Sequence, residues 1–377
     1  MEKCAQQHSG IAASASVPGT STSAADHSRG AANPPCSEAA PFSDLTLGAF
    51  LDAQAAAGSD RPFLSYPDRG FQVSYGEFNG KVDRLAKGLL AIGIEKGEHV
   101  GIWAKNVPDW LVFALATARI GAVLVPIDAV CDGHELDYLL TQADLRTFAL
   151  AERCRDVDHV KTLYELLPEL KKDPRSDLKP QRYPWLEHVI CLGGDKQCGM
   201  YNIRELLILG EHAEDRWLEA VKGEVFNTDV AVMQFTSGTT GFPKGVMLTH
   251  RSLLNTAFSV GRRMNLSETD RVCLPVPLSQ GFGFILGAMA SLAQGGTLVP
   301  IEEYDPLLTL ATIQKDRCTA VLGTPEMFTS LLDHPMFGMF DMSSLARESS
   351  PADRARAKSS IASRPRCPVG KLPSPSA

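Results

Sequence analysis

The stretch from Thr236 to Gly245 gathers residue types that bind phosphate. It holds four hydroxyl residues, three glycines and Lys244 within ten positions. Glycines permit positive φ angles and let backbone N–H groups turn toward an anion, while hydroxyls donate further hydrogen bonds and the lysine adds positive charge. The Walker pattern is absent, because Lys244 follows a proline and precedes a glycine. These residues predict a different phosphate loop; an ordinary Ser/Gly-rich surface turn is the alternative on composition alone.

Two short apolar runs flank this loop and predict the strands that carry it. Residues 230–235 lead into the loop, and residues 245–248 lead out of it. We therefore expect strand, loop and strand, with the loop at the edge of a sheet. A helix over residues 251–264 should follow, with Thr249 or His250 as its N-cap.

The first half of the chain predicts an alternation of strands and helices. Ser74 and Glu77 form an S-x-x-E capping box, which should open a helix that ends near Gly93. Strands are expected at 99–104, 122–127 and 147–150, with helices at 108–120 and 134–143 between them. Such alternation predicts βαβ units and a parallel sheet, hence an α/β fold.

The second half continues with the same kinds of element. We expect a strand at the end of 185–192, helices at 204–209, 213–221 and 284–292, strands from Val272 and at 296–300, and a strand followed by a helix from Pro325 within 318–332. His99, His134 and His159 show no metal-ligand spacing and are expected to be structural or solvated.

The ordered string from Gln234 to His250 resembles the signature loop of the adenylate-forming superfamily, the AMP-binding acyl-CoA synthetases and ligases. Residues 73–110 and 118–140 are similar to earlier motifs of that family, in the same order. The resemblance implies an α/β fold built of layered α-β-α subdomains, which forms the N-terminal domain. In the family a small C-terminal lid domain follows.

The resemblance also implies roles for individual residues. Those expected at the ATP phosphates are Thr236, Ser237, Gly238, Thr239, Thr240, Gly241 and Lys244. Of these, Thr239 or Thr240 would also approach the Mg²⁺ ion. Those expected at the acyl pocket are Gln280, Gly281, Phe282, Gly283, Gly323, Pro325 and Phe328.

One motif departs from the family pattern. Where the family usually reads Pro-Leu-aromatic-His-x-x-Gly, this chain has Ser279 at the aromatic position and Gln280 at the histidine. Glutamine can donate and accept hydrogen bonds but does not titrate, and serine leaves more volume than an aromatic ring. The departure leaves the substrate open and does not affect the expected fold.

The reaction implied by the resemblance has two halves. A carboxylate attacks the α-phosphate of ATP·Mg²⁺ and expels pyrophosphate; the thiol of coenzyme A then displaces AMP from the acyl-adenylate. We therefore expect an acid–thiol ligase, an acyl-CoA synthetase acting on fatty acids, whose partners are a carboxylic acid, ATP and CoA. Two alternatives are a non-catalytic relative that binds a nucleotide or a partner, and an aromatic-acid ligase of the coumarate type.

The two ends of the chain do not resemble the family. Residues 1–41 are rich in Ala, Ser, Gly and Pro and are expected to be disordered, residues 42–345 to form the partial AMP-binding domain, and residues 346–377 to be an unrelated disordered tail. A frameshift, a retained intron or an alternative transcript would explain that tail, with a basic docking tail as the alternative. The Tyr-Gly-x-Thr-Glu motif, the ribose-binding aspartate, the hinge and the adenylation lysine are not found. We therefore expect no ATP–pyrophosphate exchange by this chain alone.

Composition narrows the class of protein. The 377 residues are 44% hydrophobic and 21% charged, as in soluble globular proteins. A net charge of −7 argues against non-specific nucleic-acid binding, and no apolar stretch reaches the roughly 18–20 residues that span a membrane. Nine scattered cysteines without a C-x-x-C pair favour a reducing compartment. We expect the cytoplasm, or mitochondria or another organelle if residues 1–41 are a transit peptide.

Overall fold

The computed structural model describes residues 43–172, 175, 178–236 and 243–345. The chain divides into compact units between Pro41 and Phe42, and every described residue lies in the unit that begins at Phe42. Among the described helices, none combines the length and apolar character needed to cross a bilayer.

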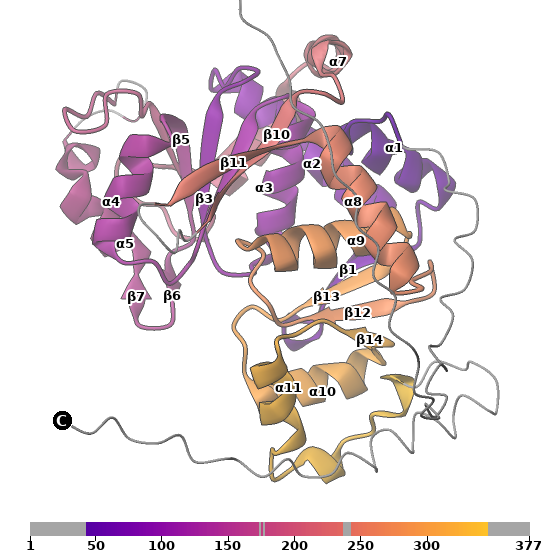
Figure 1. Ribbon diagram of the computed structural model, residues 1–377. Helices are drawn as coiled ribbons and strands as arrows, with labels where there is room; N and C mark the ends of the chain where they lie inside the picture. Colours follow the sequence, from indigo (N-terminus) through magenta and orange to yellow (C-terminus); the bar gives the residue numbers. More distant parts are fainter. Residues whose placement is uncertain (1–42, 173–174, 176–177, 237–242, 346–377) are drawn as a thin grey trace, which may run out of the picture. The chain divides into compact units, whose positions relative to one another are not determined.

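A seven-stranded sheet forms the larger half of the fold (Figure 1). From edge to edge its strands are β11 (Lys244–Thr249), β10 (Val230–Thr236), β4 (Val123–Ile127), β3 (His99–Trp103), β5 (Leu145–Leu150), β8 (His188–Cys191) and β9 (Tyr201–Asn202). Neighbouring strands run parallel, except that β10 and β11 are antiparallel. The predicted parallel sheet is thus confirmed, and the phosphate loop joins its edge strand β11 to β10.

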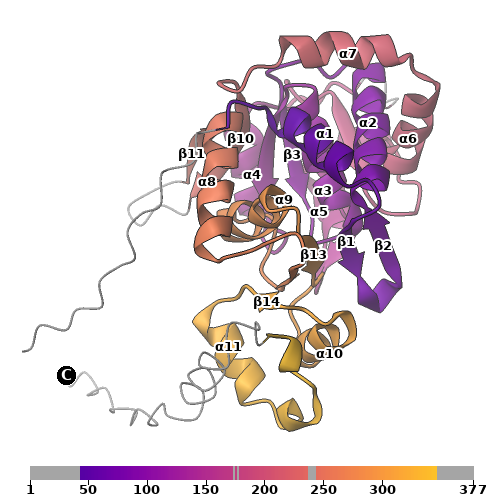
Figure 2. The same cartoon turned by 90° about the vertical axis from the view of Figure 1, so that its right-hand side faces the viewer.

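Helices cover both faces of this sheet, because the side chains of its central strands are apolar on both faces. Val100 and Leu124 pack into one core with α2 and α3, whereas Trp103 and Val125 pack into a second core with α4 and α5. Figure 2 shows α1, α2, α6 and α7 gathered on the first face. These helices are α1 (Leu47–Ala57), α2 (Tyr75–Ala91), α3 (Pro108–Arg119), α6 (Ile203–His212) and α7 (Asp215–Glu224), with α4 (Gly133–Gln142) and α5 (His159–Leu166) opposite.

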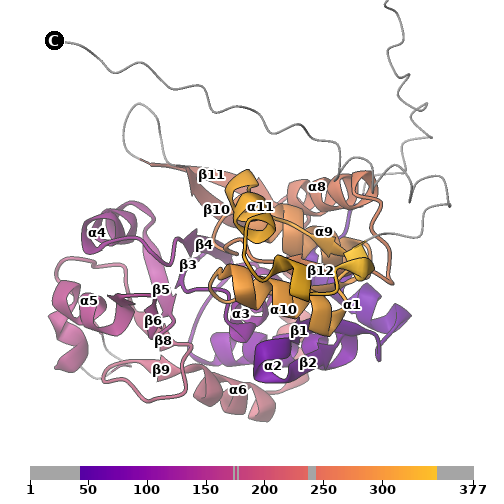
Figure 3. The same cartoon turned by 90° about the horizontal axis from the view of Figure 1, so that it is seen from below.

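A five-stranded sheet forms the second half. Its order is β14 (Ala320–Val321), β12 (Arg271–Leu274), β13 (Thr297–Pro300), β1 (Pro62–Tyr66) and β2 (Phe71–Ser74), and only β1 and β2 are antiparallel. On one face pack α8 (His250–Arg263), the π-helix η3 (Phe282–Met289) and α9 (Ala290–Ala293). On the other lie α10 (Pro306–Asp316) and α11 (Pro325–Leu332), as Figure 3 shows. The expected layered α-β-α architecture is confirmed in both halves.

Short elements complete the described chain. They are the β6–β7 hairpin (Arg153–Cys154 and Val157–Asp158) and the 3₁₀ turns η1 (Pro67–Arg69), η2 (Pro168–Lys171), η4 (Phe337–Met339) and η5 (Ser343–Leu345).

The predicted helix starts follow from local hydrogen bonds. At the start of α2, Ser74 Oγ accepts from the N–H of Glu77 at 3.2 Å and Glu77 Oε2 accepts from the N–H of Ser74 at 2.8 Å, so the capping box is confirmed. Gly93 follows the end of α2 with φ of 97°, as a glycine after a helix often does. Thr249 caps α8 by accepting from the N–H of Ser252 at 3.1 Å.

One predicted helix differs in the structure. The helix expected at 284–292 begins at Phe282 and is a π-helix until Met289. In its first turn the backbone of Gly283 lies against Pro277 O, where an added Cβ would stand at 2.0 Å. The strand expected at the end of 185–192 is confirmed as β8 (His188–Cys191).

Candidate functional site

The phosphate loop leaves β10 at the edge of the sheet where the parallel strands end. β10 runs parallel to β4, with Val232 opposite Leu124, so Thr236 and Asp128 follow their strands toward the same edge. In open α/β sheets ligands bind outside the carboxyl ends of the strands. The candidate site is therefore sought at this edge.

A cavity of about 150 Å³ opens there between the two sheets. Most of its lining follows the carboxyl ends of β3 and β4 in one sheet and of β12 and β13 in the other. The lining residues are Lys105, Asn106, Asp128, Ala129, Val130, Cys154, Arg155, Pro275, Pro277, Gln280, Glu302, Glu303, Tyr304 and Met327. We call this space the central cavity. Both sheets contribute to it, so neither half of the fold builds it alone.

The described residues of the phosphate loop lie at its two ends. Thr236 and Lys244 are both exposed and stand opposite each other in the β10–β11 register. Thr236 Oγ1 lies 3.5 Å from Lys244 O, and Tyr138 on α4 donates to Pro243 O at 3.2 Å. The two predicted strands are confirmed as β10 and β11. Ser237, Gly238, Thr239, Thr240 and Gly241 lie outside the described residues, and so do the roles predicted for them.

Among the residues predicted for the acyl pocket, Gln280 lines the central cavity. Its Nε2 donates to Asp128 Oδ2 at 3.2 Å, so the glutamine joins the carboxyl end of β4. Gly281 precedes the π-helix, and Phe282 and Gly283 form its first turn. None of these last three is part of the cavity lining.

The second group predicted for the acyl pocket lies around the start of α11. Pro325 is the first residue of α11, and Thr324 caps it by accepting from the N–H of Met327. Gly323 lies beside the Phe328 ring, which is 39% exposed. Met327, rather than Phe328, lines the central cavity. Gly323, Pro325 and Phe328 are thus near the cavity wall without forming it.

The turn over residues 275–281, which we call turn 275–281, connects the two halves of the site. Gln234 on β10 donates through Nε2 to Ser279 O at 3.1 Å. Ser279 is buried, and its hydroxyl has no hydrogen-bond partner in the described part of the chain. Ser279 is not part of the cavity lining.

Acidic and basic side chains balance at one wall of the cavity. Lys105 lies 2.5 Å from Glu303 Oε1 and 3.6 Å from Glu302 Oε2, and Arg69 also pairs with Glu302. Burial and the Glu302 carboxylate raise the pKa of Tyr66 well above its usual value, so its phenol stays protonated. It donates to Asn106 O at 2.8 Å.

Sequence reasoning missed several residues of this site. Asn106, Asp128 and Tyr304 were not singled out, because none belongs to a string with a recognisable chemical pattern. Asp128 could have been found, since a polar residue directly after a buried parallel strand marks the ligand-binding edge. Across the described residues, no group of three or more His, Cys, Asp or Glu side chains is arranged to hold a metal ion.

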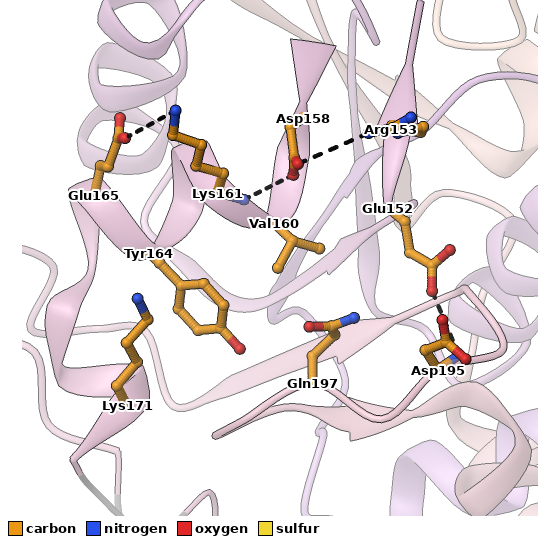
Figure 4. A pocket seen from close by; sticks show the side chains of 10 residues that line it. All are labelled: Glu152, Arg153, Asp158, Val160, Lys161, Tyr164, Glu165, Lys171, Asp195 and Gln197. Atoms are coloured by element: carbon orange, nitrogen blue, oxygen red, sulfur yellow. Dashed lines mark hydrogen bonds and ion pairs between the residues drawn. The ribbon is translucent and has the colours of Figure 1, made fainter. Parts of the chain in front are cut away.

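A larger polar hollow of about 540 Å³ lies beside the β6–β7 hairpin and α5 (Figure 4). Arg153 lies 4.0 Å from Asp158, and Lys161 lies 4.0 Å from Glu165, so cations and acids in its wall offset one another. Lys171 stands over the Tyr164 ring, 4.5 Å from its centre. No residue that the sequence predicted for the site lines this hollow.

The histidines serve the scaffold near the site. His159 is buried, with Nε2 at 2.8 Å from Ala129 O and Nδ1 at 3.1 Å from Ala151 O, and its ring stacks on Trp103 at 3.7 Å. Burial lowers the pKa of His159. His99 Nδ1 lies 2.6 Å from Ala143 O. Both fit the expected structural role.

The comparison with known families decides the assignment. The sequence profile described as AMP-binding enzyme matches residues 51–361. The chain belongs to the AMP-binding enzyme family. The resemblance drawn from the signature loop is thereby confirmed, and the matched range extends past Leu345 to residue 361.

Curated relatives carry the names of acyl-CoA synthetases and ligases. The Bacillus subtilis protein YngI, named as an acyl-CoA synthetase, is 41% identical over 300 residues, which cover 80% of this chain and 55% of the relative. The acyl-CoA ligase sidI of Aspergillus fumigatus is 36% identical over 303 residues, 80% of this chain and 50% of its own. The mitochondrial medium-chain acyl-CoA ligase ACSF2 of Danio rerio is 30% identical over 308 residues, which cover 81% of this chain and 51% of the relative. This AMP-binding chain spans about half the length of these relatives.

Solved structures share the fold. The N-terminal domain of FACL13 from Mycobacterium tuberculosis superposes with a TM-score of 0.64 at 19% identity, covering 80% of this chain and 68% of that one. The anthranilate CoA ligase AuaEII, solved with anthranoyl-AMP, superposes with a TM-score of 0.67 at 20% identity, covering 81% of this chain and 54% of that one. The expected adenylate-forming N-terminal architecture is confirmed at the level of the fold.

Proposed function

We propose that this chain supplies the ATP-phosphate loop and part of the acyl site of an acyl-CoA synthetase. The observation that carries the proposal is the hydrogen bond that Gln234 donates to Ser279 O. Gln234 lies on β10, two residues before Thr236. This hydrogen bond joins the strand entering the family's phosphate loop to the turn that carries Gln280 into the central cavity. A carboxylate in the cavity would thus lie next to the nucleotide phosphates.

The residues at the loop ends fit a bound polyphosphate. Lys244 is exposed and makes no ion pair within the described residues, so its ammonium is available to a phosphate oxygen. Thr236 presents a hydroxyl from the opposite strand. We extend the role to Ser237, Gly238, Thr239, Thr240 and Gly241 on the family pattern. Mg²⁺, bound with ATP beside Thr239 or Thr240, would neutralise part of the phosphate charge.

The chemistry asked of these groups is positioning and electrostatic stabilisation. The acid is held in the cavity with its carboxylate toward the α-phosphate, and hydrogen bonds and positive charge at the loop stabilise the charge that develops as pyrophosphate leaves. Coenzyme A then takes the acyl group from the adenylate. The relatives named as medium-chain ligases favour a fatty acid over an aromatic one.

Two measurements test this function. ATP binding is measured by titration calorimetry on this chain, and its absence would overturn the proposal. ATP–pyrophosphate exchange is measured with this chain alone and with a fusion to the part of YngI beyond the aligned region, using octanoate, decanoate, 4-coumarate and no acid. We expect exchange by the fusion with the two fatty acids. ATP binding without exchange by either protein would favour a non-catalytic relative. Exchange only with 4-coumarate would favour an aromatic-acid ligase.

For the compartment we propose the cytoplasm, with the mitochondrion as the alternative that the name of the ACSF2 relatives supports. Fractionation of cells that express the chain with a C-terminal tag decides between them.

A further inference from the structure

Asn106 is a buried amide whose hydrogen bonds reach two distant segments. It lies in the loop between β3 and α3 and is 2% exposed. Its Nδ2 donates to the carbonyl oxygens of Val276 and Ile301, each at 2.9 Å. Its Oδ1 accepts from the N–H of Leu278 at 2.7 Å. Both N–H groups of the side chain are therefore used within the protein, and the amide acts through the segments that it holds.

Turn 275–281 depends on this amide because its own backbone offers few hydrogen bonds. Pro275 and Pro277 have no N–H group. Within the turn, the N–H of Gln280 donates to Pro277 O at 3.2 Å. The N–H of Leu278 and the carbonyl of Val276 are left for Asn106, and without it both buried groups would lack a hydrogen-bond partner, which is unfavourable.

The turn is held on its other side by the residues of the candidate site. Gln234 donates to Ser279 O at 3.1 Å, and Gln280 donates to Asp128 Oδ2 at 3.2 Å. The helix that follows also closes against the turn, since Gly283 leaves no room for a Cβ beside Pro277 O. Asn106 is the buried anchor of this set, because it binds the N–H of Leu278, which lies one residue before Ser279 and two before Gln280.

We propose that Asn106 is a positioning residue, which sets the place of Gln280 in the central cavity and thereby the recognition of the acyl group. The proposal rests on the proposed function for its ligand, while the contacts of Asn106 do not depend on that function. Tyr66 supports the arrangement, because its hydroxyl donates to Asn106 O and fixes the loop itself. Within the described residues, the hydrogen bonds of Asn106 go to Tyr66, Val276, Leu278 and Ile301 and none goes to β10 or β11, so the effect should separate acyl from nucleotide recognition.

The chain provides a matched control in Asn202. It is 5% exposed, its Nδ2 donates to Gly193 O at 2.8 Å and to Asp195 O at 3.3 Å, and its Oδ1 accepts from the N–H of Arg204 at 2.9 Å. The contact pattern of Asn106 is therefore repeated at the start of α6, away from the cavity. Asn106→Ala and Asn202→Ala each remove two donated hydrogen bonds and one accepted hydrogen bond. Asn106→Asp keeps an oxygen that accepts from the N–H of Leu278 but can no longer donate to the carbonyls of Val276 and Ile301.

The test uses the 377-residue chain and two probes, ATP and octanoyl-sulfamoyl-adenosine, a stable analogue of an acyl-adenylate. We expect Asn106→Ala and Asn106→Asp to weaken binding of the analogue at least tenfold and ATP less than twofold. Asn202→Ala should leave both affinities within twofold. Hydrogen exchange followed by mass spectrometry should show faster exchange at residues 275–284 in the Asn106 variants only.

Each outcome decides the proposal. Equal losses for ATP and analogue, equal effects of the Asn106 and Asn202 variants, or unchanged exchange at 275–284 in Asn106→Ala would overturn it. If the unmodified chain binds neither probe, the proposed function fails by itself. In that case the exchange of residues 275–284 still shows whether Asn106 holds the turn, and protection that is unchanged in Asn106→Ala overturns the positioning role.

Discussion

At the scale of single residues, the candidate site combines exposed groups for a ligand with a buried amide whose hydrogen bonds are all made within the protein. Lys244 belongs to the first kind and Asn106 to the second. The difference matters for experiment. Removing an exposed group changes ligand affinity with little effect on stability, whereas removing a buried group leaves its partners without hydrogen bonds.

Lys244→Ala should weaken ATP binding about tenfold, because a charge-assisted hydrogen bond to phosphate contributes about 1.5 kcal/mol or more. The melting temperature should stay within about 2 °C, since Lys244 is exposed and the described residues give it no ion pair. Titration calorimetry with ATP measures the first effect and thermal unfolding the second. Lys172→Ala, another exposed lysine, is the control, and an ATP affinity unchanged in Lys244→Ala would refute the role.

His250 should make the fold sensitive to acid. The ring is fully buried, and Nδ1 accepts from the N–H of Leu47 at 3.2 Å, which requires the neutral form at that nitrogen. Burial lowers the pKa of His250 to about 4. The charge of Lys96 also lowers this pKa, whereas the Asp229 carboxylate raises it. A lowered histidine pKa means that the unfolded chain takes up the proton first. The stability is therefore complete above about pH 6.5 and falls as the pH drops toward 4, by up to about 3 kcal/mol.

Urea unfolding at pH values between 4 and 7.5 checks this expectation. His250→Asn should be less stable at pH 7.5 by about 1–3 kcal/mol. The gap between the two proteins should close as the pH falls, because only the unsubstituted chain loses the contribution of the neutral ring. His159 and His188, whose pKa values burial also lowers, are present in both proteins and cancel in the difference. A gap that stays constant with pH would contradict the argument.

At the scale of elements, the close contact of α2 with α6 is made by glycines. A Cβ added to Gly88 would stand 2.1 Å from Leu206 O, and one added to Gly210 would stand 1.7 Å from Arg84 O. The two helix backbones thus approach closely at these positions. The same helix α2 carries Gly80 on its exposed side, with no atom within 4 Å of an added Cβ.

Two alanine substitutions in α2 should therefore have opposite signs. Gly88→Ala should destabilise the protein by about 1–3 kcal/mol, because the backbones must separate. Gly80→Ala should stabilise it by up to about 1 kcal/mol, since alanine is the better helix former and meets no neighbour. Chemical denaturation of both variants measures the pair. A neutral or stabilising Gly88→Ala would show that the helices tolerate a wider spacing.

At the scale of the whole molecule, the second sheet is assembled from both ends of the described chain. β1 pairs with β13, with Leu64 opposite Leu298, and Tyr75 donates to Gly296 O at 2.9 Å. Phe63, Leu64 and Tyr66 are buried there. The sheet that holds turn 275–281 thus depends on strands from the first thirty-odd described residues.

A chain that begins at residue 75 should fail to fold cooperatively. It lacks α1, β1 and β2, so β13 loses one of its two neighbouring strands and the apolar faces beneath α1 are exposed. A chain that begins at Ser43 keeps every described element and serves as the control. Circular dichroism melting and gel filtration compare the two. A cooperative transition of the shorter chain at the temperature of the control would contradict this dependence.

Much of the element pattern could be predicted because its signals are local. The capping box at Ser74 and Glu77, the strands at β3, β4 and β5, and the β10–β11 pair around the phosphate loop all follow from residue types and periodicity. The π-helix that begins at Phe282 was not predicted. No periodicity distinguishes such a turn from an ordinary helix start.

The sequence by itself determined the family, because the phosphate loop is an ordered string of residues whose chemistry is carried by neighbours in the chain. Only the tertiary structure decided the composition of the central cavity. Asn106 meets Val276 and Ile301 across separations of 170 and 195 residues, and Gln234 meets Ser279 across 45. These contacts arise where two sheets bring their carboxyl ends together, and local periodicity carries no information about which loops then share a wall.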